Sequence, residues 1–192
     1  MYGSTVRGIA RGLGIHDSEA QQLIDMYFKE YPRIREYVND THTMARYNHF
    51  VFTPFGQRKQ ELGTLPPFEK SAVFNAALRN SQNVMIQSTA STLGLDSFAS
   101  LNEAIKFTGA RSLCTVYDSI EISSPIEHAA EVIELGFKYM DDVPVQKYDW
   151  LDYPIGCDAE IGISWGNLKE VHRGVTQDEI NAIITAMENR AA

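Results

Sequence analysis

The sequence holds little cysteine. Its two cysteines, Cys114 and Cys157, cannot form a disulfide framework, and neither has a Cys or His partner at the spacing of zinc ligands. We therefore expect two buried or half-buried thiols. The sequence also lacks G-x-G-x-x-G and G-x-x-x-x-G-K-[ST] motifs, which argues against a phosphate-cradling loop and a doubly wound nucleotide-binding fold.

Basic residues are also few. There are 17 Lys and Arg against 25 Asp and Glu, which gives a formal net charge of −8. A free-standing nucleic-acid binder usually has an overall positive field, so any contact with DNA must be local. No window approaches the ~18 apolar residues of a membrane span, and residues 1–4 have neither a basic region nor an apolar stretch. We expect a soluble, cytoplasmic protein.

The composition itself is that of a globular protein, with 44% apolar and 22% charged residues, and the length is enough for one domain-sized core. Helix signals dominate the first 45 residues. Ser18 and Gln21 form a capping-box pattern before apolar residues at helical spacing, and Pro32 breaks or kinks that helix. A second amphipathic run over 34–47 completes an expected helical hairpin.

Strand and turn signals follow. Aromatic and β-branched residues before Pro54-Phe55-Gly56 predict a small β-hairpin within 49–62, and the stretch from Phe68 to Gly94, without Pro or Gly between, predicts one long helix. The other expected elements are a helix over 97–107, strands over 112–117 and 120–122 with Asp118-Ser119 at their tip, a helix from the Ser124-Pro125-Ile126-Glu127 capping box to Met140, a strand over 158–165 and a short helix capped by Thr176. This order predicts an α+β fold, with helices first and then a small antiparallel sheet covered by helices.

One face of the expected long helix carries long polar side chains. Arg79, Asn83 and Gln87 are spaced by four, so all three project from the same face. Hydrogen-bond acceptors recur at every step of a DNA minor groove irrespective of sequence, and a row of long donors suits them. The alternative is the solvated face of an amphipathic helix.

Other single residues allow two interpretations each. Asp118, at a rigid hairpin tip, is suited to a hard cation such as Mg²⁺, but one carboxylate is not a two-metal site and the residue is also a common turn former. Arg58 is either a phosphate contact or a surface charge. Tyr2-Gly3 alone indicates only packing beside a turn.

The order of the motifs is more specific than any one of them. Along the chain come Tyr2-Gly3-Ser4, a segment from Glu19 to Pro32, Thr53-Pro54-Phe55-Gly56-Gln57-Arg58, Arg79, Asn83 and Gln87 with Ser88-Thr89-Ala90, and Val116-Tyr117-Asp118-Ser119. Over about residues 1–168 this order resembles the C-terminal part of family A DNA polymerases, the DNA polymerase I type.

The resemblance implies roles for individual residues. Tyr2 is similar to the tyrosine of the fingers that stacks near the templating position, and Gly3 allows the close turn after it. Arg58 resembles a basic residue that meets the nucleic-acid backbone, although Gln57 replaces the first Arg of that family segment. Arg79, Asn83 and Gln87 resemble the minor-groove residues that check newly formed primer-template pairs.

Val116-Tyr117-Asp118-Ser119 resembles the third polymerase motif, usually Val-His-Asp-Glu. The resemblance makes Asp118 the residue that holds the catalytic metals and puts Tyr117 where a His usually touches the primer end. Ser119 replaces the second carboxylate, which removes one negative charge from the site. We interpret these changes as variation rather than inactivation.

The resemblance also implies a domain layout and missing parts. Residues 1–64 correspond to the C-terminal part of the fingers with a β-hairpin, 65–168 to the C-terminal part of the palm, and 169–192 to an extension with a short helix. No Asp-x-Ser-Gln-x-Glu segment occurs in the sequence, so the first catalytic Asp must come from elsewhere. Either the protein is a truncated form or it belongs to a naturally split, phage-type polymerase, and we favour the split form.

The implied function is nucleotidyl transfer from a dNTP to a primer 3′-hydroxyl on primer-template DNA, with two Mg²⁺ ions. We expect an obligate heterodimer with an N-terminal polymerase chain, active in the host cytoplasm if the protein is viral. The competing hypothesis is a catalytically inactive fragment that binds DNA or a replication protein. A third is an unrelated α+β domain whose motifs match by coincidence.

Overall fold

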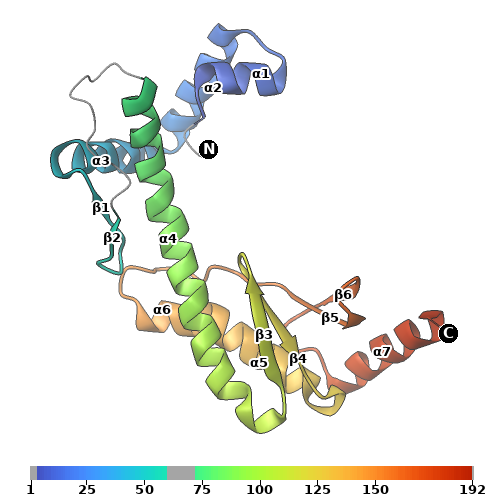
Figure 1. The fold of residues 1–192 in the computed structure, drawn as a ribbon. Coiled ribbons are helices and arrows are strands. Elements are labelled where there is room, and N and C mark those ends of the chain that lie inside the picture. The colour runs from blue at the N-terminus through green and yellow to red at the C-terminus, as the bar shows by residue number, and fades with distance from the viewer. Residues whose placement is uncertain (1–3, 60–71, 192) are drawn as a thin grey trace. The chain divides into compact units, whose positions relative to one another are not determined.

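The computed structural model describes residues 4–59 and 72–191 (Figure 1). The chain divides into two compact units, residues 1–89 and residues 90–192, and the long helix α4 (Ala72–Ala104) contributes to both. Buried apolar clusters form within each unit, so each has a core of its own.

Unit 1 begins with the helices α1 (Val6–Leu13), α2 (Asp17–Glu30) and α3 (Pro32–Asn48). Gly14, with a φ of 68°, ends α1 in the left-handed conformation that glycine adopts without strain. Pro32 separates α2 from α3, as expected, because the first helical position does not need the N–H that proline lacks.

The cap of α2 differs from the expected one. His16, not Ser18, is the capping residue, since its backbone N–H donates to Glu19 Oε2 at 3.0 Å and its Nδ1 accepts from the Ser18 N–H at 3.3 Å. The imidazole replaces the side-chain oxygen that usually fills this position, so the sequence rule missed it.

A short hairpin, β1 (Val51–Phe52) and β2 (Arg58–Lys59), follows α3 where the sequence predicted one. Its turn is closed by the N–H of Thr53, which donates to the Gln57 carbonyl at 3.0 Å. The residues buried together beneath it are Ala45, Val51, Phe74 and Leu78. The hairpin and α3 therefore pack against the first part of α4.

α4 continues through Gly94, where the sequence predicted the end of a helix. An isolated glycine costs only about 1 kcal/mol relative to alanine inside a helix, and the buried Leu93 and Leu101 hold this part of α4 in unit 2. The helix expected over 97–107 is thus the end of α4 followed by the 3₁₀ turn η1 (Ile105–Thr108). The start expected at Phe68 lies outside the described residues.

Unit 2 contains the antiparallel hairpin of β3 (Arg111–Val116) and β4 (Ser119–Ser123). Val116 pairs with Ser119, so the tip consists of Tyr117 and Asp118 and not of Asp118 and Ser119 as expected. The apolar residues that pack together beneath the hairpin are Leu101, Ile105, Val132, Ile120 and Ile122. Because Ile120 and Ile122 must face this cluster, they fix the register of β4.

The two cysteines differ in exposure. Cys114 is exposed, contrary to expectation, because the β3–β4 ladder shifts register between Ser112 and Cys114 and this bulge interrupts the alternation of the strand. Cys157 is half-buried, as expected. Burial, and then the negative charges of Asp141 and Asp158, raise the pKa of Cys157 to about 11.

The helical segment after β4 differs from the expected helix at both ends. The Ser124 hydroxyl donates to the Pro125 carbonyl (2.9 Å) and does not cap a helix, so the expected capping box is wrong. The chain then runs through η2 (Ile126–His128), α5 (Ala129–Phe137), the π-helical η3 (Lys138–Asp142) and α6 (Val143–Lys147), beyond the expected end at Met140. Pro144 is tolerated because it lies in the first turn of α6.

A polar cluster ties the end of α6 to α4. Lys147 Nζ lies 2.7 and 2.8 Å from the two carboxylate oxygens of Asp96, and the Tyr148 hydroxyl donates to Asp96 Oδ2 at 2.8 Å. Burial alone would raise the pKa of Asp96, but these hydrogen bonds outweigh it, so the pKa lies below its usual value.

β5 (Ala159–Ser164) forms a second hairpin in unit 2 with β6 (Asn167–Val171), a strand that the sequence did not predict. Gly162 is required here, because a Cβ at this position would lie 1.9 Å from the Asn167 carbonyl oxygen.

The last helix, α7 (Gln177–Ala191), is 15 residues long rather than short. Its expected cap is confirmed, since the Thr176 N–H donates to Glu179 Oε2 (2.8 Å) and the Glu179 N–H donates to Thr176 Oγ1 (3.3 Å). The buried cluster that it completes contains Ala129, Val171, Val175, Ile180, Ile184 and Met187.

The expected α+β class is confirmed: the described elements are mostly helices, with small antiparallel hairpins. No helix in residues 4–59 and 72–191 combines the length and hydrophobicity that crossing a bilayer requires.

Candidate functional site

The tip of the β3–β4 hairpin presents two chemically useful side chains to solvent. Tyr117 is fully exposed and has a φ of 56°, and Asp118 beside it is also exposed. A left-handed backbone costs a residue other than glycine about 1–2 kcal/mol. A two-residue hairpin turn requires a positive φ at its first residue, so the backbone of Tyr117 closes the turn. The exposed ring contributes no packing.

Ser119, next to this pair, is bound within the hairpin. Its hydroxyl lies 3.1 Å from the Val116 carbonyl oxygen and 3.0 Å from Glu121 Oε1, where it can donate to either acceptor. The hydroxyl therefore helps to fix the turn, while Asp118 remains the residue of the tip that carries a negative charge.

Asp118 suits a hard cation as one ligand of a larger set. Its carboxylate is held on a two-residue turn between paired strands, which restricts its motion. Across residues 4–59 and 72–191, no three His, Cys, Asp or Glu side chains gather as metal ligands. A two-metal site therefore fits this tip only if further carboxylates come from outside the described part of the chain.

The second candidate group lies in unit 1, on α4. Arg79 and Asn83 are half-buried and Gln87 is exposed, and their spacing of four places them along one face of the helix. The polar ridge that the sequence predicted on this helix therefore has a continuous helical backbone beneath it.

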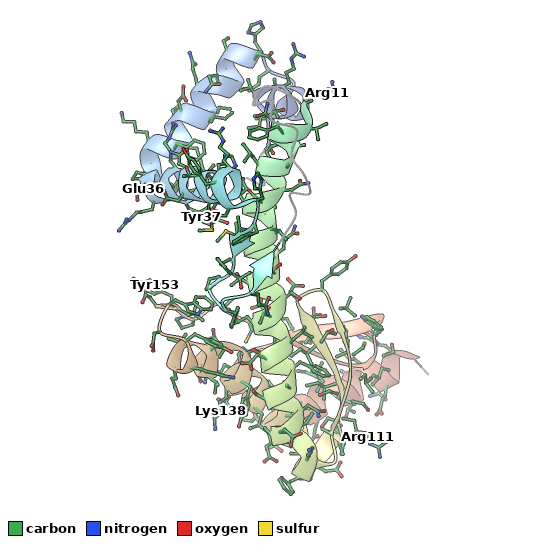
Figure 2. The ribbon with its side chains drawn as sticks, turned by 60° about the vertical axis from the view of Figure 1, so that its left-hand side comes forward. Arg11, Glu36, Tyr37, Arg111, Lys138 and Tyr153 are labelled. Carbon is green, nitrogen blue, oxygen red and sulfur yellow. The ribbon has the colours of Figure 1, made fainter. Side chains whose placement is uncertain are left out.

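A neighbouring face of α4 is locked to α3, and this fixes the direction of the ridge. The hydroxyl of Tyr37, a residue labelled in Figure 2, donates to the Gln82 carbonyl at 2.8 Å, and His42 Nε2 lies 3.0 Å from Gln82 Oε1. Gln82 is buried and directly precedes Asn83, so α4 cannot rotate about its axis without breaking these contacts.

His42 is a neutral linker in this lock. Burial lowers the pKa of its imidazole, and the positive charges of Arg46 and Arg79 lower it further. Sequence reasoning missed Tyr37, His42 and Gln82. No local pattern marks them, because the contacts join residues 40 or more positions apart.

The other predicted residues are only partly covered by the structure. Arg58 lies on β2, and its backbone pairs with that of Phe52. Tyr2 and Gly3 lie outside the described residues. The structure thus brings Tyr117 and Asp118 together in unit 2, and Arg79, Asn83 and Gln87 together in unit 1.

Comparison with known proteins gives one consistent result. The family model for DNA polymerase family A matches residues 1–167. DNA polymerase I of Deinococcus radiodurans is 31% identical over 169 residues, which are 88% of this chain and 17% of that protein. The thermostable DNA polymerase I of Thermus aquaticus is 30% identical over 172 residues, 88% of this chain and 20% of that protein.

A solved structure agrees with the sequence match. The POL domain of Pol1 from M. smegmatis, in complex with DNA primer-template and dNTP, superposes with a TM-score of 0.69 at 27% identity and covers 81% of this chain and 26% of that one. The chain spans about a fifth of the length of the curated relatives named above. Motif order, fold and these matches agree, and the chain belongs to DNA polymerase family A.

Proposed function

We propose that this chain is the C-terminal part of a template-directed DNA polymerase and contributes the third polymerase motif and the minor-groove residues to its active site. The observation that carries the proposal is an exposed carboxylate, Asp118, on a left-handed turn in a chain of family A. A solvent-facing carboxylate held on a tight turn suits a catalytic ion.

The proposed metal role uses one residue of this chain. Asp118 would hold Mg²⁺ together with carboxylates from the rest of the polymerase. The bound ions would lower the pKa of the primer 3′-hydroxyl and neutralise charge on the phosphates of the dNTP. Tyr117, beside Asp118, is fully exposed, and its hydroxyl would hydrogen-bond a primer phosphate or sugar.

The α4 ridge would read the DNA. Arg79, Asn83 and Gln87 present donors at one-turn intervals, and the minor groove presents acceptors at each base step. The related POL domain from M. smegmatis was solved with primer-template and dNTP, which supports the same ligands here. By the same resemblance, Arg58 would contact the DNA backbone, and Tyr2 and Gly3 would lie beside the incoming nucleotide.

In the split form, the remaining polymerase segments would come from a second, N-terminal polymerase chain in an obligate heterodimer, whereas in a truncated form they would belong to the same polypeptide. The sequence contains no Asp-x-Ser-Gln-x-Glu segment, and two-metal chemistry needs a further carboxylate. Within this assignment residues 1–64 belong to the fingers, 65–168 to the palm and 169–192 to an extension. The assembled enzyme would act in the cytoplasm, that of the host if the protein is viral.

The test is extension of a labelled primer-template with Mg²⁺ and dNTPs. This chain is assayed alone and then with the polymerase-like polypeptide that co-purifies from its native host. We expect synthesis only in the mixture, and a loss of about 10³-fold with Asp118→Ala, because the metals supply several kcal/mol of charge stabilisation. Glu160→Ala is the control, since it removes another exposed hairpin carboxylate. Undiminished synthesis by Asp118→Ala would overturn the assignment.

The alternative, an inactive DNA-binding fragment, is favoured by one observation. Ser119 stands where the family has its second carboxylate, and its hydroxyl is bound within the hairpin. Such a fragment would bind primer-template but extend it in no mixture.

Gln87→Ala tests the ridge separately. It should lower the rate about tenfold and raise misincorporation, because one hydrogen bond contributes about 0.5–1.5 kcal/mol, while the Mg²⁺ dependence stays the same. Unchanged rate and fidelity would show that the ridge is the solvated face of an amphipathic helix.

A further inference from the structure

The segment after β6 lies beyond the residues that the model of DNA polymerase family A matches, which end at 167. It is nevertheless part of the core of unit 2. Ile180, Ile184 and Met187 of α7 are buried against Ala129 of α5 and Val171 of β6. The segment is therefore packed against the rest of unit 2.

The segment also makes polar contacts at the start of α5. Gln177 Oε1 accepts the backbone N–H of Ala130 at 3.2 Å, and Gln177 Nε2 donates to the Ile126 carbonyl at 2.6 Å. One side chain thus satisfies a donor in the first turn of α5 and an acceptor in η2.

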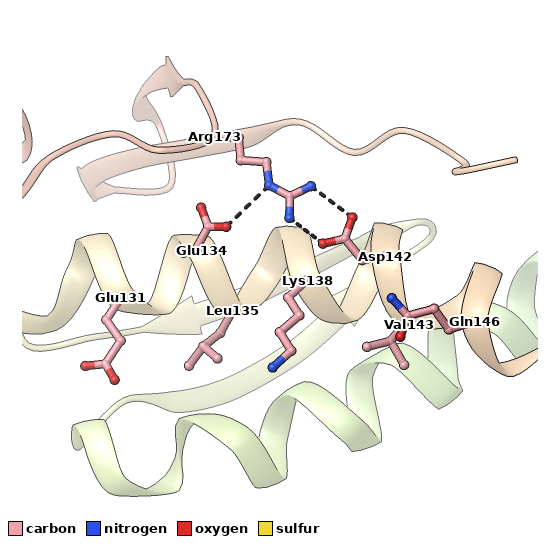
Figure 3. A pocket seen from close by; sticks show the side chains of 8 residues that line it. All are labelled: Glu131, Glu134, Leu135, Lys138, Asp142, Val143, Gln146 and Arg173. Atoms are coloured by element: carbon pink, nitrogen blue, oxygen red, sulfur yellow. Dashed lines mark hydrogen bonds and ion pairs between the residues drawn. The ribbon is translucent and has the colours of Figure 1, made fainter.

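A second contact lies near the other end of α5. Arg173 forms a bidentate ion pair with Asp142, in which Nη1 lies 2.9 Å from Oδ1 and Nη2 contacts Oδ2. The Nε of Arg173 lies 3.3 Å from Glu134 Oε1 (Figure 3). These hydrogen bonds lower the pKa of Asp142 and raise that of Arg173. Paired guanidinium and carboxylate groups of this geometry hold their partners in a fixed orientation.

α5 in turn supports the hairpin that carries Asp118. Val132 of α5 is buried with Leu101 and Ile105, and Ile120 and Ile122 of β4 pack against the same cluster. Ile120 lies two residues from Asp118 along the chain. A shift of α5 would therefore move the cluster on which the hairpin rests.

We propose that residues 173–187 are a C-terminal brace that positions the metal-binding turn. Gln177 and Arg173 are positioning residues: they hold α5 near its two ends, and α5 holds β4 and thereby Asp118. The inference rests on the proposed function for the role of Asp118, but the mechanical link from α7 to the hairpin does not.

The first arm measures the link without any activity. Hydrogen exchange of residues 111–123 is compared in the full chain and in the variant with both Arg173→Ala and Gln177→Ala. We expect about tenfold faster exchange in the hairpin. Arg190→Ala with Asn189→Ala removes the same kinds of side chain from the exposed end of α7 and should change nothing. Asp96→Asn, which cuts the tie between α4 and α6, should also leave the hairpin unchanged.

The second arm measures the position of the carboxylate in the complemented polymerase. The variant with both Arg173→Ala and Gln177→Ala, the brace variant, should need about fivefold more Mg²⁺ for half-maximal extension, with kcat recovered at saturating Mg²⁺. A variant with Arg173→Lys in place of Arg173→Ala keeps the positive charge and should need less Mg²⁺ than the brace variant. A merely destabilised enzyme would lose kcat at every Mg²⁺ concentration, which would overturn the positioning role.

The two arms separate the two proposals. Unchanged hairpin exchange in the brace variant refutes the brace, whatever the polymerase assay gives. Faster hairpin exchange together with no extension by any wild-type mixture supports the brace and refutes the proposed function.

Discussion

The two hairpins of unit 2 are built alike and end differently. Each is an antiparallel pair with a register shift, at Ser112/Cys114 in β3–β4 and at Gly162/Ser164 in β5–β6. The β5–β6 hairpin rests on the apolar cluster of α5 and α7, and Trp165 at its tip brings no ionisable group. The β3–β4 hairpin ends in an exposed Tyr–Asp pair with a left-handed residue.

The irregular residues of the two hairpins therefore have different roles, one in packing and one in presenting reactive groups. In β5–β6 the special residue is Gly162, which lets two backbones approach, so the irregularity serves packing. In β3–β4 the special residue is Tyr117, whose positive φ closes the two-residue turn while its ring stays fully exposed. Glycine or asparagine would meet the same backbone requirement with less strain, so a fully exposed tyrosine at this position is where function is expected. Variants that disturb the packing of β5–β6, and variants that replace the left-handed Tyr117 of β3–β4, test this distinction.

The largest loss of stability is expected from a substitution in the apolar cluster on which the β5–β6 hairpin packs. Ile180 is fully buried in the cluster shared by α5, α7 and β6. Ile180→Ala should lower the free energy of unfolding by about 3 kcal/mol, from lost burial and the cavity left behind. Urea denaturation of the full chain measures it. Ile163→Ala on β5, where the side chain is exposed, is the matched control, and an equal loss there would contradict the assignment of the core.

Much of this architecture could be predicted from sequence because local signals and packing agree. Pro32 marks the break between α2 and α3 and the Thr176–Glu179 capping box marks the start of α7, and apolar spacing indicated most helices and strands. The errors occur where tertiary contacts override local rules. Gly94 does not end α4, because neighbouring buried leucines hold the helix.

The candidate site divides in the same way. The sequence indicated Asp118, but the tip lies one residue earlier, since cross-strand pairing at Ser119 is decided by burial of Ile120 and Ile122. The lock between His42 and Gln82 was not predictable, because it joins residues 40 positions apart. Long-range polar pairs leave no periodic signal in one sequence.

The next largest change in stability is expected when the register shift of β5–β6 is disturbed, compared with that of β3–β4. A Cβ at Gly162 would meet the Asn167 carbonyl oxygen, so Gly162→Ala must push the strands apart and should cost about 2 kcal/mol of unfolding free energy. Leu113, which interrupts the β3–β4 ladder, is exposed, and Leu113→Ala should change stability by less than about 0.5 kcal/mol. Equal unfolding midpoints in urea for the two variants would show that the bulges are equivalent.

The smallest effect is also the sharpest test of the comparison. Tyr117→Gly removes the left-handed penalty of about 1–2 kcal/mol but adds the entropy cost of glycine, about 0.5–1 kcal/mol. The variant should therefore be as stable as the wild type or up to about 1.5 kcal/mol more stable in urea denaturation. The exposed ring contributes no buried area that could be lost.

The same variant should lower primer extension in the complemented enzyme, because it removes the hydroxyl beside Asp118 and frees the turn that holds the carboxylate. Tyr117→Asn separates these causes, since asparagine tolerates the left-handed region and keeps the turn without the ring. If Tyr117→Gly lost stability and kept full activity, Tyr117 would be a structural residue and the hairpins would not differ in role. Higher stability with lower activity places the strain at the site of the chemistry, the result expected where a fold gives up stability for function.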